Sequence, residues 1–255
     1  MRKFSCFCWL IILFGSSFAQ TSGEFTEPWK KSNIAIALDP FHGNSIDWEQ
    51  LATDKRVAGI IHKAVQGKSK DPKYAERRTI AKQRNYKWGS YHLLTTADPI
   101  EQAKFYLATV GASDDEILAV DVECTVATTD CGSASFKVKL EDVKKFIVYI
   151  KKETGRYPLV YCNNAVTKEI STKYKGDEIF SKVPLWYARF VRKEVTDFPK
   201  GVWTTYSFWQ FSSEINCNPQ INCLYRVPGT KTDMDVNVYN GTVEELRNNW
   251  AQIGK

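Results

Sequence analysis

The sequence predicts an α/β protein built as a (β/α)₈-like barrel whose last helices are missing or shortened. Eight short runs of apolar, β-branched and aromatic residues recur along the 255-residue chain, which is the pattern of buried strands. Helix-like segments separate the early runs, and strand alternating with helix favours a parallel sheet. Between the last strands lie segments 191–206 and 212–233, which are rich in Pro, Gly, Thr, Ser and Asn and indicate loops.

These elements are expected at definite positions. The strand candidates are Ile34–Leu38, Gly59–Val65, Lys87–Leu94, Glu116–Glu123, Leu159–Asn163, Leu185–Phe190, Ser207–Phe211 and Asp235–Tyr239. The helix candidates are Asp47–Lys55, Asp71–Asn85, Pro99–Val110, Leu140–Thr154 and Asn164–Tyr174. An open doubly wound sheet is the alternative, but it needs a Gly-rich phosphate-binding turn after its first strand, and residues 38–43 contain none.

The N-terminus has the pattern of a secretory signal over residues 1–19, with Gln20 as the new N-terminus. Arg2 and Lys3 precede an apolar stretch, residues 4–14, that is short for a bilayer span, and small residues follow at the positions that a signal peptidase reads. A membrane anchor is the alternative, although no stop-transfer pattern follows. We therefore expect export to the extracellular space or periplasm.

The rest of the chain is expected to comprise a flexible polar lead-in, residues 20–33, and one large domain over residues 34–255. Loss of the leader lowers the formal net charge from +6 to about +4. This mild positive charge favours an acidic polymer such as a bacterial wall. The sequence has no dense Lys/Arg stripe with interleaved aromatic residues, so nucleic acid is not an expected partner. We expect a monomer without stable membrane insertion.

Five cysteines remain beyond the leader, and export makes disulfides plausible. Cys124–Cys131 and Cys217–Cys223 each flank a short polar loop and are the expected pairs. Cys162 lies in an apolar run and is expected to be a buried free thiol. All five reduced is the alternative. With three His and no Cys-x-x-Cys pair, the sequence does not predict a zinc site.

Asp121 and Glu123 are the most informative residues of the chain. They close the apolar run 117–120, and since a strand alternates its faces with period two, both carboxylates project to the same side. Two carboxylates at the end of a buried strand are costly unless chemistry uses them. Glycoside hydrolysis requires such a pair.

Other polar and aromatic residues stand at the expected C-terminal strand ends, where barrels of this type gather their chemistry. In chain order these ends carry Asp39, Lys63, Tyr91, His92, Asp121, Glu123, Tyr161, Asn163, Trp186, Tyr187, Trp209, Gln210, Asp235 and Asn237. Aromatic rings stack on the apolar faces of sugars, and polar groups bind hydroxyls. Each of these residues also has a structural alternative. Asp39 would be a turn residue, Lys63 a solvated cation and Asp235 a loop cap. His92, Trp186 and Trp209 would be core residues.

Several short motifs follow one another along the chain. They are Leu38-Asp39, Gly43 and Ile46-Asp47-Trp48; Lys63-Ala64-Val65-Gln66-Gly67; Gly89-Ser90-Tyr91-His92; Gln102-Ala103; Asp121-Val122-Glu123; Leu185-Trp186-Tyr187-Ala188; Trp209-Gln210-Phe211; and Asp235-Val236-Asn237. Together they resemble glycoside hydrolase family 25, the lysozymes (N-acetylmuramidases) of bacteria, phages and some fungi, over most of residues 34–240. The resemblance implies a single flattened TIM-like barrel of eight strands and about five helices, acting on peptidoglycan glycan strands without a metal or organic cofactor.

The resemblance also implies roles for the acidic residues. Glu123 would be the general acid that protonates the glycosidic oxygen, Asp121 its partner carboxylate, and Asp39 and Asp235 the remaining acidic pair. Attack by the substrate's own acetamido group is expected in preference to a direct carboxylate nucleophile. The residues expected to bind substrate are Lys63, Tyr91, His92, Tyr161, Trp186, Trp209 and Gln210.

The chain departs from the family pattern at a few positions. Gln66 stands where the family usually has Glu, Pro40-Phe41 replaces a Ser-containing stretch, and both disulfide loops look like additions. None of these changes removes an acid. Two other functions remain open: a chitinase-like hydrolase, which would need a longer Asp-x-x-Asp-x-Asp-x-Glu run, and a non-catalytic wall-glycan-binding protein, which would have no need of Glu123.

Overall fold

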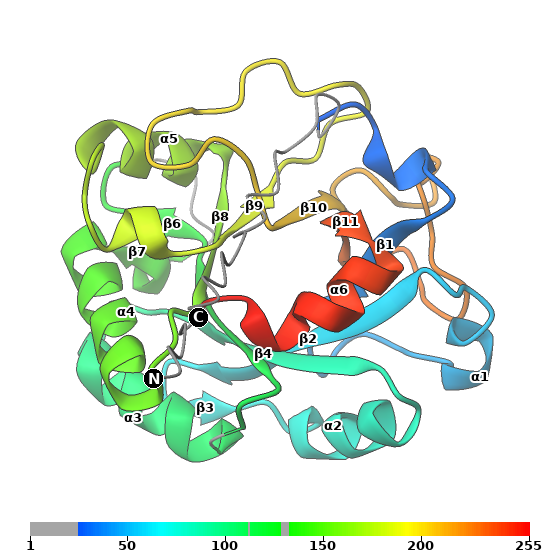
Figure 1. Ribbon diagram of the computed structural model, residues 1–255, viewed down its shortest axis with the longest axis horizontal. Helices are drawn as coiled ribbons and strands as arrows, with labels where there is room; N and C mark the ends of the chain where they lie inside the picture. The colour runs from blue at the N-terminus through cyan, green and yellow to red at the C-terminus, as the bar shows by residue number, and fades with distance from the viewer. Residues whose placement is uncertain (1–24, 112, 129–132) are drawn as a thin grey trace, which may run out of the picture.

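The computed structural model describes residues 25–255 except residues 112 and 129–132. Eight strands form a closed barrel (Figure 1). Around the barrel they are β1 (Ile34–Leu38), β11 (Val236–Thr242), β10 (Phe208–Ser212), β9 (Leu185–Ala188), β8 (Leu159–Asn163), β5 (Ile117–Val122), β4 (Lys87–Leu93) and β2 (Val57–Gln66), which pairs back with β1. The predicted eight-stranded barrel is confirmed. Its strands are parallel except β11, which runs antiparallel to both neighbours.

The helices lie where the sequence predicts them, with one addition. They are α1 (Trp48–Leu51), α2 (Tyr74–Gln83), α3 (Pro99–Val110), α4 (Leu140–Thr154), α5 (Asn164–Lys173) and the unpredicted α6 (Val243–Asn249). Short strands β3 (Ser69–Lys70), β6 (Cys124–Thr125) and β7 (Lys137–Val138) and the 3₁₀ turns η1 (Pro28–Lys30), η2 (Ala134–Phe136), η3 (Phe180–Lys182) and η4 (Trp250–Gln252) complete the described elements. No helix in the described ranges is both long and apolar enough to cross a bilayer.

Loops and the N-terminal segment cover the outer face of the last strands, where helices are lacking. Trp29 is 3% exposed and stacks on Phe211, with ring centroids 4.7 Å apart. Phe25 contacts Trp209 and the loop residue Phe198. The described part of the predicted lead-in is therefore packed on the barrel through these aromatic rings.

The C-terminal residues close one end of the barrel. In Figure 1, α6 lies across the middle of the barrel. Trp250, just after α6, is fully buried against Gly59 and Phe208 and donates its indole N–H to the backbone oxygen of Trp88 at 2.8 Å. The interior is thus a packed core at this end, and its opening lies at the other end, where the parallel strands terminate.

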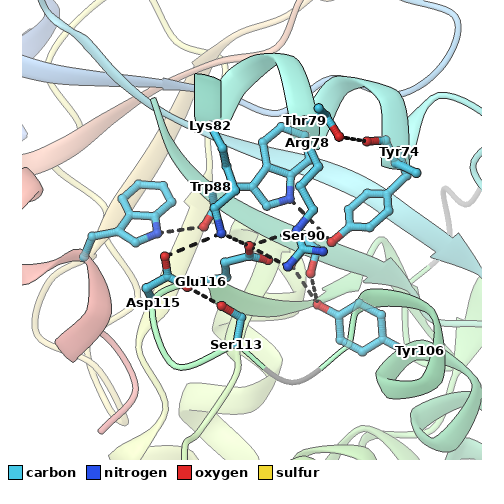
Figure 2. A network of polar contacts seen from close by, with 12 residues as sticks. Tyr74, Arg78, Thr79, Lys82, Trp88, Ser90, Tyr106, Ser113, Asp115 and Glu116 are labelled. Carbon is cyan, nitrogen blue, oxygen red and sulfur yellow. Dashed lines mark hydrogen bonds and ion pairs between the residues drawn. The ribbon is translucent and has the colours of Figure 1, made fainter. Parts of the chain in front are cut away.

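A polar network joins α2 and α3 to the sheet at the plugged end (Figure 2). Glu116, just before β5, is 3% exposed and accepts hydrogen bonds from Arg78 at 2.9 Å and Lys82 at 2.6 Å. Nearby, the Tyr106 hydroxyl donates to the backbone oxygen of Ser90 at 2.9 Å. Because it lies at the N-terminal ends of the strands, this network serves stability rather than chemistry.

Candidate active site

Strand alternation directs one set of side chains into the barrel. On β5, Ile117 and Ala119 face the inner core, Asp121 follows on the same face, and Glu123 continues that direction beyond the strand end. The same parity on β1 places Asp39 after Ala35 and Ala37. Along the inner face of β1 and β5, apolar residues therefore lie near the plugged end and carboxylates lie at the open end.

The open end contains a small cavity of about 40 Å³, roughly the volume of one water molecule. All four predicted acids line it, together with four of the predicted substrate-binding residues: Asp39, Tyr91, Asp121, Glu123, Tyr161, Trp186, Gln210 and Asp235. These residues lie in, or directly next to, β1, β4, β5, β8, β9, β10 and β11, so only the closed barrel brings them together.

Asp39 is held by two amide side chains. Gln210 donates to Asp39 Oδ2 at 2.6 Å, and Asn237 donates to Asp39 Oδ1. Gln210 in turn accepts from the Tyr161 hydroxyl at 2.7 Å, and Asn237 accepts from the Trp186 indole N–H at 2.6 Å. This chain of bonds fixes the orientation of both amides and of both rings that line the cavity.

The buried acids hold their protons more tightly than free carboxylic acids. Burial raises the pKa of Asp39, Asp121 and Asp235 well above the ordinary value, and neighbouring carboxylates raise it further. Within the described ranges, Asp121 Oδ1 and Asp235 Oδ1 are buried without a hydrogen-bond partner. Both residues line the cavity.

Glu123 stands at the mouth of this cavity. Its side chain is reached by solvent, yet the surrounding protein desolvates it and raises its pKa, and the charge of Glu214 adds to the effect. Lys63 opposes both. The Lys63 ammonium lies 4.6 Å from the centre of the Phe41 ring, and its own pKa is lowered by burial, against the charges of Asp71, Asp121 and Glu123. Lys63 is therefore close enough to the acids to influence them, although it does not line the cavity.

Two predicted substrate-binding residues lie outside the barrel lumen. His92 is fully buried, stacks on Phe146 of α4 and contacts Gln102 at 3.1 Å. Trp209 is also fully buried and packs against Trp29. Their inward-facing strand neighbours are Tyr91 and Gln210. His92 and Trp209 therefore do not join the other predicted residues at the cavity, because adjacent strand residues face opposite sides.

Two residues of the site were not predicted as site residues. Asn237 stands at a strand end in the sequence, two positions after Asp235, and this shared parity is the signal that identifies it. Glu214 is an exposed loop residue whose charge acts on Glu123 and Asp235. No periodic pattern surrounds Glu214, so its role depends on the fold.

The cysteine predictions are met as far as the described residues allow. Cys217 and Cys223 form a disulfide, and Cys162 is a buried free thiol. Cys124 is disulfide-bonded as well, while Cys131, its predicted partner, lies outside the described residues.

Comparison with known proteins identifies the fold and the family. The family model described as Glycosyl hydrolases family 25 matches residues 40–219. The uncharacterized protein YegX of Escherichia coli K12 is 27% identical over 209 residues, covering 79% of this chain and 68% of that protein. The N,O-diacetylmuramidase of Arthroderma benhamiae is 26% identical over 196 residues, covering 74% of each chain.

Solved structures share the barrel. A bacterial lysozyme from Streptomyces coelicolor superposes with a TM-score of 0.66 at 21% identity, covering 86% of this chain and 98% of its own. A family GH25 lysozyme from Aspergillus fumigatus gives a TM-score of 0.63 at 23% identity, covering 84% and 98%.

Proposed function

Since this chain belongs to glycosyl hydrolases family 25 and is a glycoside hydrolase, we propose that it is a muramidase acting on peptidoglycan. It would cleave the β-1,4 bond between N-acetylmuramic acid and N-acetylglucosamine. The observation that carries this proposal is the clustering of Glu123 with Asp39, Asp121 and Asp235 around one cavity at the open end of the barrel.

Glu123 is proposed as the general acid. A general acid must be protonated at the working pH, and the raised pKa of Glu123 favours that state. Its position at the mouth leaves the carboxyl within reach of a polymer that cannot enter the cavity itself. The proton passes from Glu123 to the glycosidic oxygen as the bond from that oxygen to the anomeric carbon breaks.

Asp121 is proposed to orient the 2-acetamido group of the muramic acid residue. The acetamido oxygen would then form the new bond to the anomeric carbon, and water would open the resulting ring while returning a proton to Glu123. The unpartnered Asp121 Oδ1 supports this role because it is a free acceptor for the acetamido N–H. Asp39 and Asp235 border the same cavity, and in their ionised forms they would favour the positive transition state, although their raised pKa values oppose that ionisation.

Digestion of purified peptidoglycan tests the proposal. The mature protein, its Glu123→Gln variant and a matched Glu76→Gln variant on the exposed face of α2 are each incubated with the wall, and the fragments are analysed by mass spectrometry. We expect fragments with reducing-end N-acetylmuramic acid from the wild type and Glu76→Gln only. Good binding with an intact wall in every case would overturn the muramidase proposal and favour a lectin-like function; activity on chitin alone would favour a chitinase-like one.

Export and oligomeric state stay predictions. Residues 1–19 lie outside the described residues. We propose that they direct export and that the mature enzyme acts as a monomer outside the cytoplasm, which N-terminal sequencing and light scattering of the secreted protein would test.

A further inference from the structure

A groove of about 880 Å³ runs beside α5, and we call it the α5 groove. Its walls come from α5, from the segment after β9 and from two separate loops that contribute Ala127 and Ile215. Figure 1 shows α5 and the long β9–β10 loop on the same side of the molecule. This volume lies in the range that holds drug-sized ligands, about 300–1,000 Å³.

The α5 groove begins where the acid cavity ends. Tyr161 lines the cavity, and Asn163, two residues along the same face of β8, lines the groove. Trp186 and Ala188 repeat this relationship on β9. Asn163 also donates to the backbone oxygen of Glu123 at 3.1 Å. A side branch of a polymer bound at Glu123 could therefore extend directly into the α5 groove.

The lining of the groove is basic. It contains the cations Lys168, Lys173 and Arg189, against the single acid Glu169. Lys173 pairs with Glu169 at 2.5 Å, and Arg189 pairs with Asp197, which is largely exposed. In the described part of the chain Lys168 forms no ion pair. Surface pairs of this kind are weak, so the groove favours an anionic ligand.

Beside the polar residues Thr128, Asn163, Asn164 and Thr172, the apolar part of the lining is aliphatic rather than aromatic. Ile215 is 62% exposed, Val191 and Ala127 add further apolar surface, and Phe190 is the one aromatic residue among the described lining residues. A chain of sugar rings would be expected to meet several flat aromatic faces. Aliphatic patches between cations instead suit a short peptide with small apolar side chains and free carboxylates.

We propose that the α5 groove binds the acidic peptide stem that peptidoglycan carries on its muramic acid residues. This inference rests on the proposed function, because the stem is attached to the sugar that would lie over Asp121. One stem carboxylate would bind Lys168, and another would replace Asp197 as the ion-pair partner of Arg189. The alanine methyl groups of the stem would pack on Ile215 and Val191. Binding energy from this remote branch would seat the glycosidic bond at Glu123 and so raise kcat/KM.

Two substrates and four variants test the proposal. Intact peptidoglycan strands are compared with strands from which an amidase has removed the peptides. We expect the wild type to cleave intact strands with about tenfold higher kcat/KM, and Lys168→Glu or Ile215→Asn to remove most of this preference without changing cleavage of the stripped strands. Lys152→Glu and Val148→Asn, which alter exposed residues of the same types on α4, should keep it.

Equal cleavage of both substrates by the wild type would overturn the inference. Equal loss on both substrates in the groove variants would also overturn it, since the groove would then bind the glycan itself. Calorimetry with a free stem peptide and the Glu123→Gln protein separates the two proposals. If no strand is cleaved but the peptide binds and Lys168→Glu weakens binding about tenfold, the muramidase proposal fails and the peptide site stands. No binding overturns the site.

Discussion

Gln210 donates a hydrogen bond of 2.6 Å to Asp39, although the two residues are 171 positions apart in the chain. The same amide accepts from Tyr161, so its orientation is set from both sides. Replacing Gln210 with Leu leaves Asp39 with one of its two amide donors and leaves the Tyr161 hydroxyl unpaired. We expect kcat on peptidoglycan to fall about ten- to a hundredfold, as when partners that orient other catalytic groups are removed.

The matched control for this change is Gln102→Leu. Gln102 is as buried as Gln210 but contacts His92 on the outer side of the sheet. Its replacement should lower the free energy of unfolding while the folded enzyme keeps its kcat. Unchanged kcat in Gln210→Leu would contradict a positioning role.

The charges around Glu123 predict opposite shifts in the pH profile. Glu214 raises the pKa of Glu123, and Lys63 lowers it. As the proposed general acid, Glu123 would work only while protonated, so the alkaline limb of kcat/KM should follow this pKa. Glu214→Gln should move the limb to lower pH, and Lys63→Met should move it to higher pH.

Profiles of kcat/KM against pH check both shifts, with the exposed Lys175→Met as a control that leaves the limb in place. Shifts of the same sign in Glu214→Gln and Lys63→Met would show that Glu123 does not set the limb.

Asp121 should make the fold less stable as pH rises. Burial raises its pKa above the ordinary value of 3.8, with Glu123 adding to the effect and Lys63 opposing it. The contribution of Asp121 to the free energy of unfolding is therefore complete below that ordinary value. It is lost as pH rises through the raised pKa. Asp121→Asn should unfold like the wild type near pH 4 and be more stable by about 1–3 kcal/mol at neutral pH.

Urea denaturation at several pH values measures this difference. The exposed Asp114→Asn should show no such pH dependence. A variant that is less stable than the wild type at neutral pH would show that the ionised Asp121 is compensated in the native state.

Gly59 gives Trp250 its space in the barrel plug. A Cβ at position 59 would lie 2.3 Å from Trp250 Cζ3, so Gly59→Ala should cost about 1–3 kcal/mol through overpacking. Adding Trp250→Phe removes part of the indole and should recover some of this loss. A double-mutant cycle by urea denaturation measures the coupling, and additive effects would contradict the predicted contact.

Alternation predicts which residues enter the site only when it is applied residue by residue. It places Asp121 and Glu123 together correctly. The same rule excludes His92 beside Tyr91 and Trp209 beside Gln210, because neighbours on a strand cannot both face the lumen. A strand end therefore contributes only one of two adjacent residues to the lumen.

Other features depend on partners distant in the chain. The antiparallel direction of β11 has no local signal, because the connection before it lacks a helix just as the connection between the parallel strands β9 and β10 does. The unpredicted α6 has a local signal, the capping box formed by Thr242 and Glu245. The influence of Glu214 on Glu123 has no such signal, since it arises only when two distant loops meet.

The pairing of β1 with β11 sets an order of events during synthesis. Asn237, the partner of Asp39, is 198 positions further along the chain, so a nascent chain cannot assemble its acid cluster until the last strand has been made. Contacts of such long range also slow folding. The enzyme is thus inactive throughout its own translation, and a product truncated before β11 would carry Asp121 and Glu123 without a barrel to position them.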